Sequence, residues 1–570
     1  MDGDFEGLSR GKVLVVGDDT RSFLATVRSL GRQGIVVHAA PTDFRSPALT
    51  SRYIAAIHDV PPWMGDGADW LAAMQALLQA EAYDLVIPCD ERALLPLQRH
   101  RAALSGLARL AIPDDAAIAV LFDKHATREL ARQAGVAISP GRLARADDTG
   151  AGLLAEFGAP VVLKPRRSYT LDGLGTRGRV LVLSDPAKLD RALADSDPDS
   201  ALVEAYFAGE GLGVSILASG GRLLQAFEHH RVHERSGSSF YRVSAPLDPE
   251  LVQACAAVAG ALGYTGVAMF EFKRNPTGAW VLLEVNARPW GSLPLPVALG
   301  VDFPFRWYRL LVEGAETPPV DYRTGVYGRN LLPDLVACVA DAQASRLSPG
   351  RFALFMAGRV LEVRRTLTGA EVQDVMVRDD PRPGRAELAR AARGVTRRVA
   401  RRMPGTTGRV RAAAAAQVRA AAGVRPVRIL FVCQGNICRS PFAEAALRAR
   451  LADPARAEIA SAGMIPRPGR PTPGFGVAAA GALGLDLAAH RSAWLTRAAA
   501  AAASLIVVFD DVNVAAIADR YPDLRTRVVK LGDLIGEGDV ADPVDGDRAL
   551  FDQTYAQIGR GVEALARLLV

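Results

Sequence analysis

Short apolar runs alternate with amphipathic helical patterns along the first part of the chain. Residues 12–17 read Lys-Val-Leu-Val-Val-Gly, a helical pattern follows at 23–30, and a second apolar run lies at 34–38. A helix–strand pair at 70–81 and 84–88 repeats the order. Strands that alternate with helices predict a parallel sheet. The first turn carries a single glycine, so it is not a dinucleotide-binding fingerprint.

The middle of the chain places acidic side chains inside apolar strands. Glu271 lies within the run at 266–272, and Glu284 and Asn286 project from one face of the run at 282–286. Two acids in neighbouring apolar strands are costly without a cation, although they could also be exposed acids on a strand face. Carboxylate and amide oxygens are ligands that suit Mg²⁺. These three residues are therefore the candidate metal ligands.

Two lysines and a short polar–aromatic segment accompany this pattern. Lys124 opens a helix that ends near Gly135, and Lys164 ends the strand at 159–165. Each lysine alone could be an ordinary solvated charge, but together they would neutralise the phosphates of ATP. The loop after Lys164 carries glycines, and a further apolar strand leads into a hinge. These glycines are Gly173, Gly175 and Gly178, and the hinge reads Glu204-Ala205-Tyr206-Phe207.

In this order, the pieces resemble the ATP-grasp superfamily, specifically its carbamoyl-phosphate-synthetase-like branch. The resemblance covers about residues 10–315, and its clearest part is Glu271 followed by Glu284-Val-Asn286-Ala-Arg288. It implies ATP bound through Mg²⁺ or Mn²⁺, with the hinge backbone at the adenine and Glu210 at the ribose. It also implies formation of an acyl phosphate from a carboxylate, stabilised by Arg288.

Two details of this region depart from the family or leave an alternative open. Relatives often have paired glycines in the phosphate loop, where this chain reads Tyr-Thr-Leu-Asp-Gly at 169–173. Closure of that loop over ATP is therefore less secure than ATP binding itself. The histidines at 229, 230 and 233 lie where relatives shape the acceptor site, and they could instead form a metal cluster.

The C-terminal region contains one assembled motif, at residues 429–441. A run of β-favouring residues leads to Cys433, and Arg439 follows six positions later with Ser440 and Pro441. A strand, a loop of inward-pointing N–H groups and a helix N-terminus make an anion site. That positive field lowers a thiol pKa, and arginine can grip two phosphate oxygens at once. The alternative is a buried structural cysteine at a strand end.

Residues 427–570 resemble the low-molecular-weight protein tyrosine phosphatases. Cys433 is then the nucleophile, and Arg439 and Asp542 complete the catalytic set. Asp542 precedes a proline and would protonate the leaving oxygen, although Asp-Pro is also ordinary turn chemistry. The phosphate-binding residues implied by the resemblance are Gly435, Asn436, Ile437, Cys438 and Ser440. Further matching pieces lie at 461–463, 485–486, 490–492 and 505–510.

Three features narrow the expected activity. Cys438 could shield Cys433 through a reversible disulfide, and no cysteine follows it, which argues against arsenate reduction. Ile437 stands where arginine-phosphatase relatives carry Thr, which favours aryl phosphoesters such as phosphotyrosine. Val544 and Asp545 stand where phosphotyrosine enzymes usually have an aromatic residue, so a small or glycan-linked phosphoester is also open.

Length and charge complete the domain plan. At 570 residues, the chain should hold three or four domain-sized units. Thirteen arginines and one acid lie between residues 381 and 428, which predicts a basic linker with helical segments. The segment has no aromatic residues, which argues against a nucleic-acid-binding element. A functional basic surface is the alternative. The expected parts are a Rossmann-like domain (10–120), an ATP-grasp domain (121–315), an extension (316–378), the linker (379–425) and a parallel-sheet α/β phosphatase domain (426–570).

The extension carries no motif, and its apolar pieces at 354–357 and 360–363 suggest strands. Five cysteines make no disulfide framework, no apolar run reaches 18 residues, and the acidic start lacks a secretory core, so we expect a cytoplasmic protein. The expected function is bifunctional: a carboxylate ligase and a phosphatase. The alternative is a phosphatase regulated by a non-catalytic nucleotide-binding module. Small carboxylates, nucleophiles and a phosphorylated protein or phosphoester would be the substrates; the oligomeric state stays open.

Overall fold

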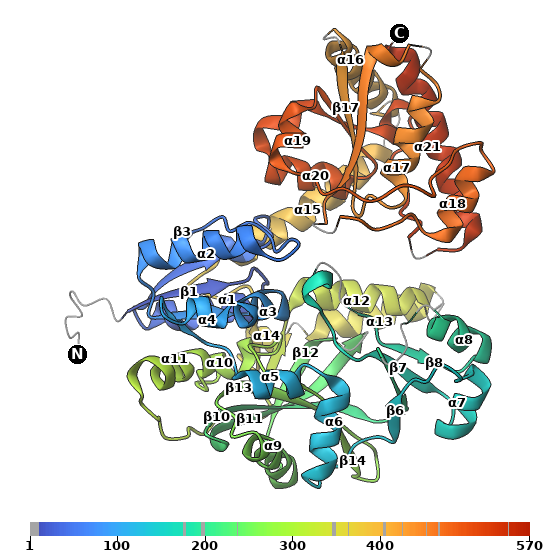
Figure 1. The fold of residues 1–570 in the computed structure, drawn as a ribbon. Coiled ribbons are helices and arrows are strands. Elements are labelled where there is room, and N and C mark those ends of the chain that lie inside the picture. The colour runs from blue at the N-terminus through green and yellow to red at the C-terminus, as the bar shows by residue number, and fades with distance from the viewer. Residues whose placement is uncertain are drawn as a thin grey trace. The chain divides into compact units, whose positions relative to one another are not determined.

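The structure is a computed structural model of the 570-residue chain. It describes residues 11–174, 178–194, 196, 200–235, 238–344, 349–362, 364–402, 406–423, 426–451, 453–465, 468–544 and 546–569. The chain forms two compact units, one of Met1–Pro61 with Gly67–Leu388 and the other of Pro62–Asp66 with Ala389–Val570. We call them the N-terminal and C-terminal units (Figure 1) and describe each by itself. Among the described residues, no helix is both long enough and apolar enough to cross a membrane.

The N-terminal unit begins with a parallel five-stranded sheet in the order β3-β2-β1-β4-β5. Its strands are β1 (Lys12–Val16), β2 (Val36–Ala40), β3 (Ile54–Ile57), β4 (Leu85–Pro88) and β5 (Arg109–Leu110). The connecting helices are α1 (Ser22–Arg32), α2 (Ala68–Glu81), α3 (Glu91–Arg99) and α4 (Arg101–Leu104). The chain adds β2 and β3 on one side of β1 and then β4 and β5 on the other, so the order of strand addition reverses between β1 and β4. Helices α1 and α2 lie on opposite sides of the sheet (Figure 1). The α/β alternation expected from the sequence is confirmed.

A small antiparallel sheet follows, in the order β6-β9-β7-β8. Its strands are β6 (Gly141–Leu143), β7 (Val161–Pro165), β8 (Leu181–Leu183) and β9 (Ala201–Ala205), with helices α5 (Asp115–Leu121), α6 (Lys124–Gln133), α7 (Gly150–Phe157) and α8 (Pro186–Ala194). The Asp123 carboxylate accepts hydrogen bonds from the N–H groups of His125 and Ala126, which explains why α6 begins at Lys124. Gly175 of the expected phosphate loop lies outside the described residues.

A seven-stranded sheet carries the remaining polar residues of interest, in the order β14-β13-β10-β11-β12-β15-β16. Its strands are β10 (Glu210–Ser219), β11 (Arg222–Arg235), β12 (Ser238–Ala245), β13 (Gly266–Arg274), β14 (Trp280–Asn286), β15 (Tyr327–Arg329) and β16 (Glu371–Gln373). Helices α9 (Pro249–Ala261), α10 (Pro294–Ala298) and α11 (Phe303–Glu313) accompany it. Apolar residues of β10, β11 and β13 join the cores on both sides of this sheet.

The extension at 316–378 differs from expectation in its secondary structure. It holds α12 (Leu331–Ala344), α13 (Pro349–Glu362) and α14 (Arg364–Leu367), and the expected strand at 354–357 lies inside α13. That prediction was wrong because Leu, Phe, Met and Ala there are helix-compatible and only Val360 is β-branched. Residues 360–362 of the second expected strand also lie in α13, so that prediction was wrong too, and Val363 lies outside the described residues. The extension still completes the large sheet, through β15 and β16.

The C-terminal unit is a parallel four-stranded sheet in the order β18-β17-β19-β20, flanked by helices. The strands are β17 (Val427–Cys433), β18 (Ala457–Gly463), β19 (Leu505–Val508) and β20 (Val528–Lys530). The helices are α17 (Arg439–Arg448), α18 (Gly474–Gly481), α19 (Arg497–Ala502), α20 (Asp511–Arg520) and α21 (Arg548–Leu569). This is the parallel α/β architecture that the sequence predicted.

Two helices occupy the segment expected as a basic linker, α15 (Arg382–Arg402) and α16 (Thr406–Ala422). Helix α16 packs into the core of the C-terminal unit, where Val418 is fully buried and Ala414 nearly so. Ala414 and Val418 are four residues apart and form an apolar stripe on one helix face. Arginines occupy other positions of the same helix. The high charge of the segment therefore suggested a linker, although one face of α16 packs into the core.

Candidate functional sites

The loop between β17 and α17 wraps its backbone around the sulfur of Cys433. Cys433 is the last residue of β17 and is buried. Asn436 adopts a left-handed backbone conformation with φ of 52°, which asparagine tolerates better than most residues. This turn brings the Asn436 N–H to 3.2 Å from the Cys433 sulfur, and the Ser440 hydroxyl lies 3.1 Å from the same atom. Both groups can donate to a thiolate.

The side chain of Asn436 fixes the shape of this loop. Its amide nitrogen donates to the hydroxyl oxygens of Ser440 and Ser461, at 2.9 and 2.8 Å. Its carbonyl oxygen accepts from the Ala493 N–H at 2.7 Å, and its main-chain carbonyl lies 2.7 Å from Nε2 of His490. The distant sequence pieces around residues 461 and 490 therefore support the loop rather than the reacting atoms.

Arg439 stands at the start of α17, and its guanidinium is held from two sides. One nitrogen donates to Asp510 at 2.7 Å and to the Val540 carbonyl at 3.0 Å. The other donates to Asp542 at 2.5 Å. The structure thus brings Cys433, Arg439 and Asp542, the three expected catalytic residues, around one loop.

The remaining loop residues also lie at this site. Cys438 is buried and forms no disulfide. Burial, together with Asp542 and Cys433, raises the pKa of its thiol above the usual range. The Tyr555 hydroxyl donates to the Cys438 carbonyl at 3.2 Å. Such a thiol stays protonated near neutral pH, so Cys433 is the better candidate nucleophile.

A cavity open to solvent in the N-terminal unit gathers residues of the second expected site. Lys124, Glu284, Asn286 and Arg288 all line it. The other lining residues come from α3, α5, α6, β14 and the loop after β7: Glu91, Leu121, Phe122, Thr127, Ser168, Tyr169, Val285 and Ala287. The Lys124 ammonium donates to the Ser168 hydroxyl at 2.8 Å.

The candidate metal ligands come together on β13 and β14. Glu271 and Glu284 are direct partners in the antiparallel pair, beside a register irregularity at Glu271 and Phe272. Directly opposed side chains in such a pair have Cβ atoms about 5 Å apart. Glu271 also binds Arg231 and accepts from the Asn286 amide nitrogen at 3.1 Å. Two facing carboxylates with an amide are a donor set that fits Mg²⁺.

Arg288 follows β14 and joins the two sheets of the N-terminal unit. Its guanidinium donates to Glu91 at 2.9 Å and to the Asn286 side-chain oxygen at 3.0 Å. Asn286 therefore turns its oxygen to Arg288 and its nitrogen to Glu271. Glu91 begins α3 at the carboxyl end of β4, so this ion pair ties the first sheet to the cavity.

Lys164 and the hinge form a second polar group that does not line the cavity. Lys164 pairs with Glu204 at 2.5 Å, and Arg128 pairs with the other oxygen of Glu204 at 2.6 Å. Glu204 is buried, so its carboxylate holds two cations in place. The other expected ATP-binding residues follow β9 or begin β10: Ala205, Tyr206, Phe207 and Glu210. The Ala205 N–H is bonded to the Pro140 carbonyl, and Lys273 lies over the Tyr206 ring.

Known proteins resemble the two units separately. A family model described as "Low molecular weight phosphotyrosine protein phosphatase" matches residues 428–570. The probable low molecular weight protein-tyrosine-phosphatase EpsP of Ralstonia nicotianae (strain ATCC BAA-1114 / GMI1000) is 36% identical over 136 residues, which cover 24% of this chain and 91% of EpsP. The chain belongs to the low molecular weight protein-tyrosine-phosphatase family.

The N-terminal unit has its own relatives. A model described as "ATP-grasp in the biosynthetic pathway with Ter operon" matches residues 197–329, which confirms the ATP-grasp prediction. The arginine-specific carbamoyl phosphate synthase large chain of Bacillus subtilis (strain 168) is 25% identical over 186 residues, 31% of this chain and 17% of that protein. An ADP complex of N5-carboxyaminoimidazole ribonucleotide synthetase aligns over 60% of this chain and 86% of its own, with a TM-score of 0.47 and 19% identity.

A solved phosphatase also aligns with the C-terminal unit. Vibrio vulnificus Wzb in complex with benzylphosphonate is 30% identical, covers 25% of this chain and 97% of its own, and has a TM-score of 0.24. Both TM-scores lie below 0.5, so the family assignments rest on the sequence matches.

Sequence reasoning missed several residues of this phosphatase and ATP-grasp chain. Asp510 was seen only as the end of an apolar strand, yet it holds Arg439. Arg470 donates to the Gly435 carbonyl at 2.7 Å and so lies at the edge of the phosphate loop. Glu91 and Arg128 were also missed, because each acts through an ion pair across more than 70 residues. No local pattern marks such pairs.

The histidines expected as a rival metal cluster point to separate partners. His229 is buried beside Gly213, His230 contacts Glu228 at 3.1 Å, and His233 contacts Asp334 at 2.9 Å. Asp334 and Cys338 lie near enough to His233 to share an ion. Asp334, however, is already paired with Arg329 at 2.9 Å.

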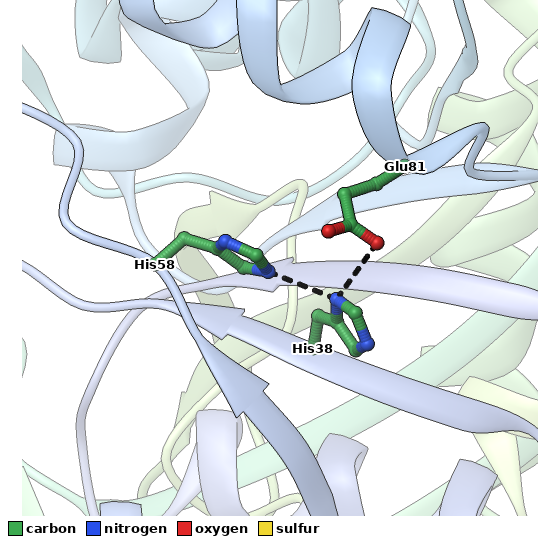
Figure 2. Close-up of side chains that lie close together, drawn as sticks. All are labelled: His38, His58 and Glu81. Carbon is green, nitrogen blue, oxygen red and sulfur yellow. Dashed lines mark hydrogen bonds and ion pairs between the residues drawn. The ribbon is translucent and has the colours of Figure 1, made fainter.

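A different histidine group lies at the first sheet, where His38, His58 and Glu81 converge (Figure 2). Nδ1 of His38 is 2.9 Å from Nε2 of His58 and 3.8 Å from the Glu81 carboxylate. The Tyr83 hydroxyl lies 2.8 Å from the same His38 nitrogen, and Lys12 binds Glu81. A hydrogen-bond network with its own cation accounts for this group, and we assign no metal to it.

Proposed function

We propose that this chain is a bifunctional enzyme, an ATP- and Mg²⁺-dependent carboxylate ligase joined to a phosphomonoesterase. The observation that carries the proposal is that each unit brings together reactive side chains suited to its own chemistry. Cys433, Arg439 and Asp542 meet at one loop, and Glu284, Asn286 and Arg288 meet in one cavity. A merely nucleotide-sensing module could use Glu284 and Asn286 to bind MgATP, but it would not need Arg288 to hold a carboxylate.

The phosphatase reaction follows from the loop geometry. The phosphate oxygens bind to the loop N–H groups and to Arg439, where they displace the Asp542 carboxylate from the guanidinium. Asp542 takes up a proton once it has left Arg439; the Cys433 thiolate then attacks phosphorus, and Asp542 gives that proton to the leaving oxygen as the phosphorus–oxygen bond breaks. Asp542 then takes a proton from the water that hydrolyses the phosphocysteine. The Asn436 N–H and the Ser440 hydroxyl stabilise the sulfur as a thiolate in each cycle.

The ligase reaction joins a carboxylate to a nucleophile through an acyl phosphate. A carboxylate oxygen attacks the γ-phosphorus of ATP, and ADP leaves; the nucleophile then attacks the carbonyl carbon, and phosphate leaves. Lys124 and Lys164 neutralise phosphate charge, and Arg288 holds the carboxylate. Glu271, Glu284 and Asn286 would hold Mg²⁺, which would supply further positive charge beside the phosphates. Charge neutralisation and positioning are the chain's main contributions.

The substrates are proposed by class. The ATP-grasp model's own description refers to a biosynthetic pathway, so we propose a small-molecule ligation in biosynthesis. For the phosphatase, Val544 is exposed next to Asp542-Pro543 and offers no aromatic surface for a phosphotyrosine ring. A phosphorylated protein or a small phosphoester fits equally at the loop. None of the five cysteines forms a disulfide in the described part of the chain, which supports a reducing compartment such as the cytoplasm.

The phosphatase is tested with Cys433→Ser on an aryl phosphate. We expect complete loss of turnover with an unchanged melting temperature, because a hydroxyl is not ionised at neutral pH. Asp542→Asn should slow alkyl phosphates much more than activated aryl phosphates, because only a poor leaving group needs the acid. Substantial turnover by the serine variant would disprove the phosphocysteine route.

The ligase is tested with Glu284→Gln and MgATP in the full chain. The wild-type chain should gain thermal stability from ATP only with Mg²⁺ or Mn²⁺ present, and the variant should lose that gain. ADP should form only when a carboxylate and a nucleophile are added. MgATP binding without any turnover across a broad carboxylate panel would favour the second candidate, a regulatory nucleotide module for the phosphatase.

A further inference from the structure

Arg21 lies in the connection between β1 and α1, outside the sites described above. Its guanidinium makes no hydrogen bond or ion pair with any residue in the described part of the chain, and lies over the Phe240 ring at 5.4 Å. It also packs flat against Gly291, where an added Cβ would come within 2.7 Å of its Nη1. The glycine at position 291 therefore leaves space for the Arg21 guanidinium, but the described residues give that guanidinium no hydrogen-bond acceptor.

Among the described residues, neither of the two acids near Arg21 forms a hydrogen bond or an ion pair with its guanidinium. The Asp19 carboxylate accepts from the N–H groups of Arg21, Ser22 and Phe23, so it is used as the cap of α1. The Asp374 carboxylate is taken by both terminal nitrogens of Arg242, at 2.8 and 2.6 Å. Both anions near Arg21 are thus committed elsewhere.

Arg28 shows how the same fold treats a structural arginine. Arg28 lies seven residues further along the chain, within α1, and is buried. Its guanidinium donates to the Asp380 side chain and to three main-chain carbonyls, all at 2.8 to 2.9 Å. Burial lowers the pKa of both arginines. A hydrogen bond to Asp380 opposes this shift for Arg28, whereas only the charges of Asp19 and Asp374 oppose it for Arg21. A half-buried cation without a hydrogen-bonded anion is costly, which points to a missing anion.

The position of Arg21 is also that of a ligand site. Arg21 follows β1 and Glu91 follows β4, the neighbouring strands between which the sheet order reverses. Ligands of open parallel sheets bind in the crevice at the carboxyl ends of such strands. Glu91 already reaches this crevice, because it lines the cavity and pairs with Arg288.

The loop at 288–292 connects the two places. Gly291 touches Arg21 and lies three residues after Arg288, a span of at most about 10 Å of chain. Within the described residues, three buried polar atoms of this loop have no hydrogen-bond partner: Arg288 Nε, Trp290 Nε1 and the Ser292 hydroxyl. All three can donate, as an anion requires.

We propose that Arg21, with the loop at 288–292, binds a second anionic group of the ligase substrate. The substrate is then a small molecule with a carboxylate to be activated at Arg288 and a further carboxylate or phosphate roughly 10 Å or less away. This inference rests on the proposed ligase function and narrows its substrate class to dianions. Arginine suits either anion because its planar fork binds two oxygens at once.

The test compares anions of one size on the full chain. Thermal unfolding of the N-terminal unit is followed with MgATP present, at constant ionic strength, in butyrate, succinate or phosphoglycolate. Succinate or phosphoglycolate should raise the wild-type midpoint above that in butyrate, and Arg21→Met should remove this difference. Succinate alone would indicate a second carboxylate, and phosphoglycolate alone a phosphate. Equal midpoints in all three anions, or a difference that survives in Arg21→Met, would overturn the subsite.

Matched variants separate binding from folding. Arg21→Met should leave the ligand-free midpoint unchanged or higher, whereas Arg28→Met should lower it, because only Arg28 is satisfied. Gly291→Ala should displace Arg21 and reproduce the loss of anion selectivity, and Arg309→Met, which breaks an exposed pair with Glu313, should change nothing. An Arg21→Met variant as unstable as Arg28→Met would make Arg21 structural and refute the subsite. MgATP that fails to bind at all would instead refute the ligase proposal.

Discussion

Asp510 is predicted to position Arg439, and Asp510→Asn is the perturbation that tests this role. The Asp510 carboxylate accepts from Arg439 at 2.7 Å with one oxygen and from the Asn513 N–H at 2.7 Å with the other. Asparagine is also a good helix cap, so the substitution preserves the start of α20 and removes mainly the charge that faces Arg439.

The expected size of the effect comes from the charged hydrogen bond between Asp510 and Arg439, which the substitution removes. A hydrogen bond to a charged group contributes about 1.5 to 3 kcal/mol. If that energy is lost from the placement of Arg439 in the transition state, kcat/KM should fall roughly 10- to 100-fold. Arg439 keeps its bonds to Val540 and Asp542, so activity should not vanish.

The assay is hydrolysis of an aryl phosphate, together with vanadate inhibition and denaturant unfolding. The variant should bind vanadate more weakly and lose kcat/KM at concentrations where it is fully folded. Asp523→Asn is the matched control, because it breaks an exposed ion pair with Arg497 in the same unit and should alter neither quantity. Wild-type kcat/KM and vanadate affinity in Asp510→Asn would refute the positioning role.

Two further predictions follow from packing and charge. Residues 406–570 should fold and hydrolyse aryl phosphates like the full chain. The fragment 424–570 should be less stable by at least about 2 kcal/mol, because it lacks the fully buried Val418. Equal urea midpoints for the two fragments would contradict this prediction. Hydrogen bonds from Arg142 lower the pKa of Asp148 below its usual 3.8, so its stabilising effect should be complete above about pH 4 and lost as the pH falls further. Asp148→Asn should therefore destabilise the chain by about 1 kcal/mol at pH 7 and by progressively less as the pH falls below about 4, and a pH-independent difference in unfolding free energy would exclude this linkage.

The sequence predicted those parts of the sites whose residues are contiguous or share one strand pair. The motif from Cys433 to Pro441 is a strand end, a loop and a helix start in one stretch, so its chemistry is local. Glu271, Glu284 and Asn286 could be recognised for a similar reason, because β13 and β14 are sequential antiparallel partners. Alternation of strands and helices was sufficient to predict the first parallel sheet, whereas the second was expected from the resemblance to the phosphatase family.

The remaining parts depend on packing between distant segments. Asp510 reaches Arg439 across 71 residues and Glu91 reaches Arg288 across 197, and neither pairing has a local signal. The apolar residues at 354–357 have no clear period, so a strand and a helix could not be told apart. Helix α16 was hidden by its arginines, although Ala414 and Val418 form the stripe that packs.

The central claim is that the N-terminal unit is a working ligase, and ³¹P NMR of the turnover products tests it most directly. The full chain with Cys433→Ser would be given MgATP, a panel of mono- and dicarboxylates and an amine, so that the phosphatase cannot consume any product. We predict ADP and inorganic phosphate that grow only when a carboxylate and the amine are both present, and that disappear with Glu284→Gln. AMP with pyrophosphate, or ATP hydrolysis independent of any carboxylate, would contradict the acyl-phosphate ligase.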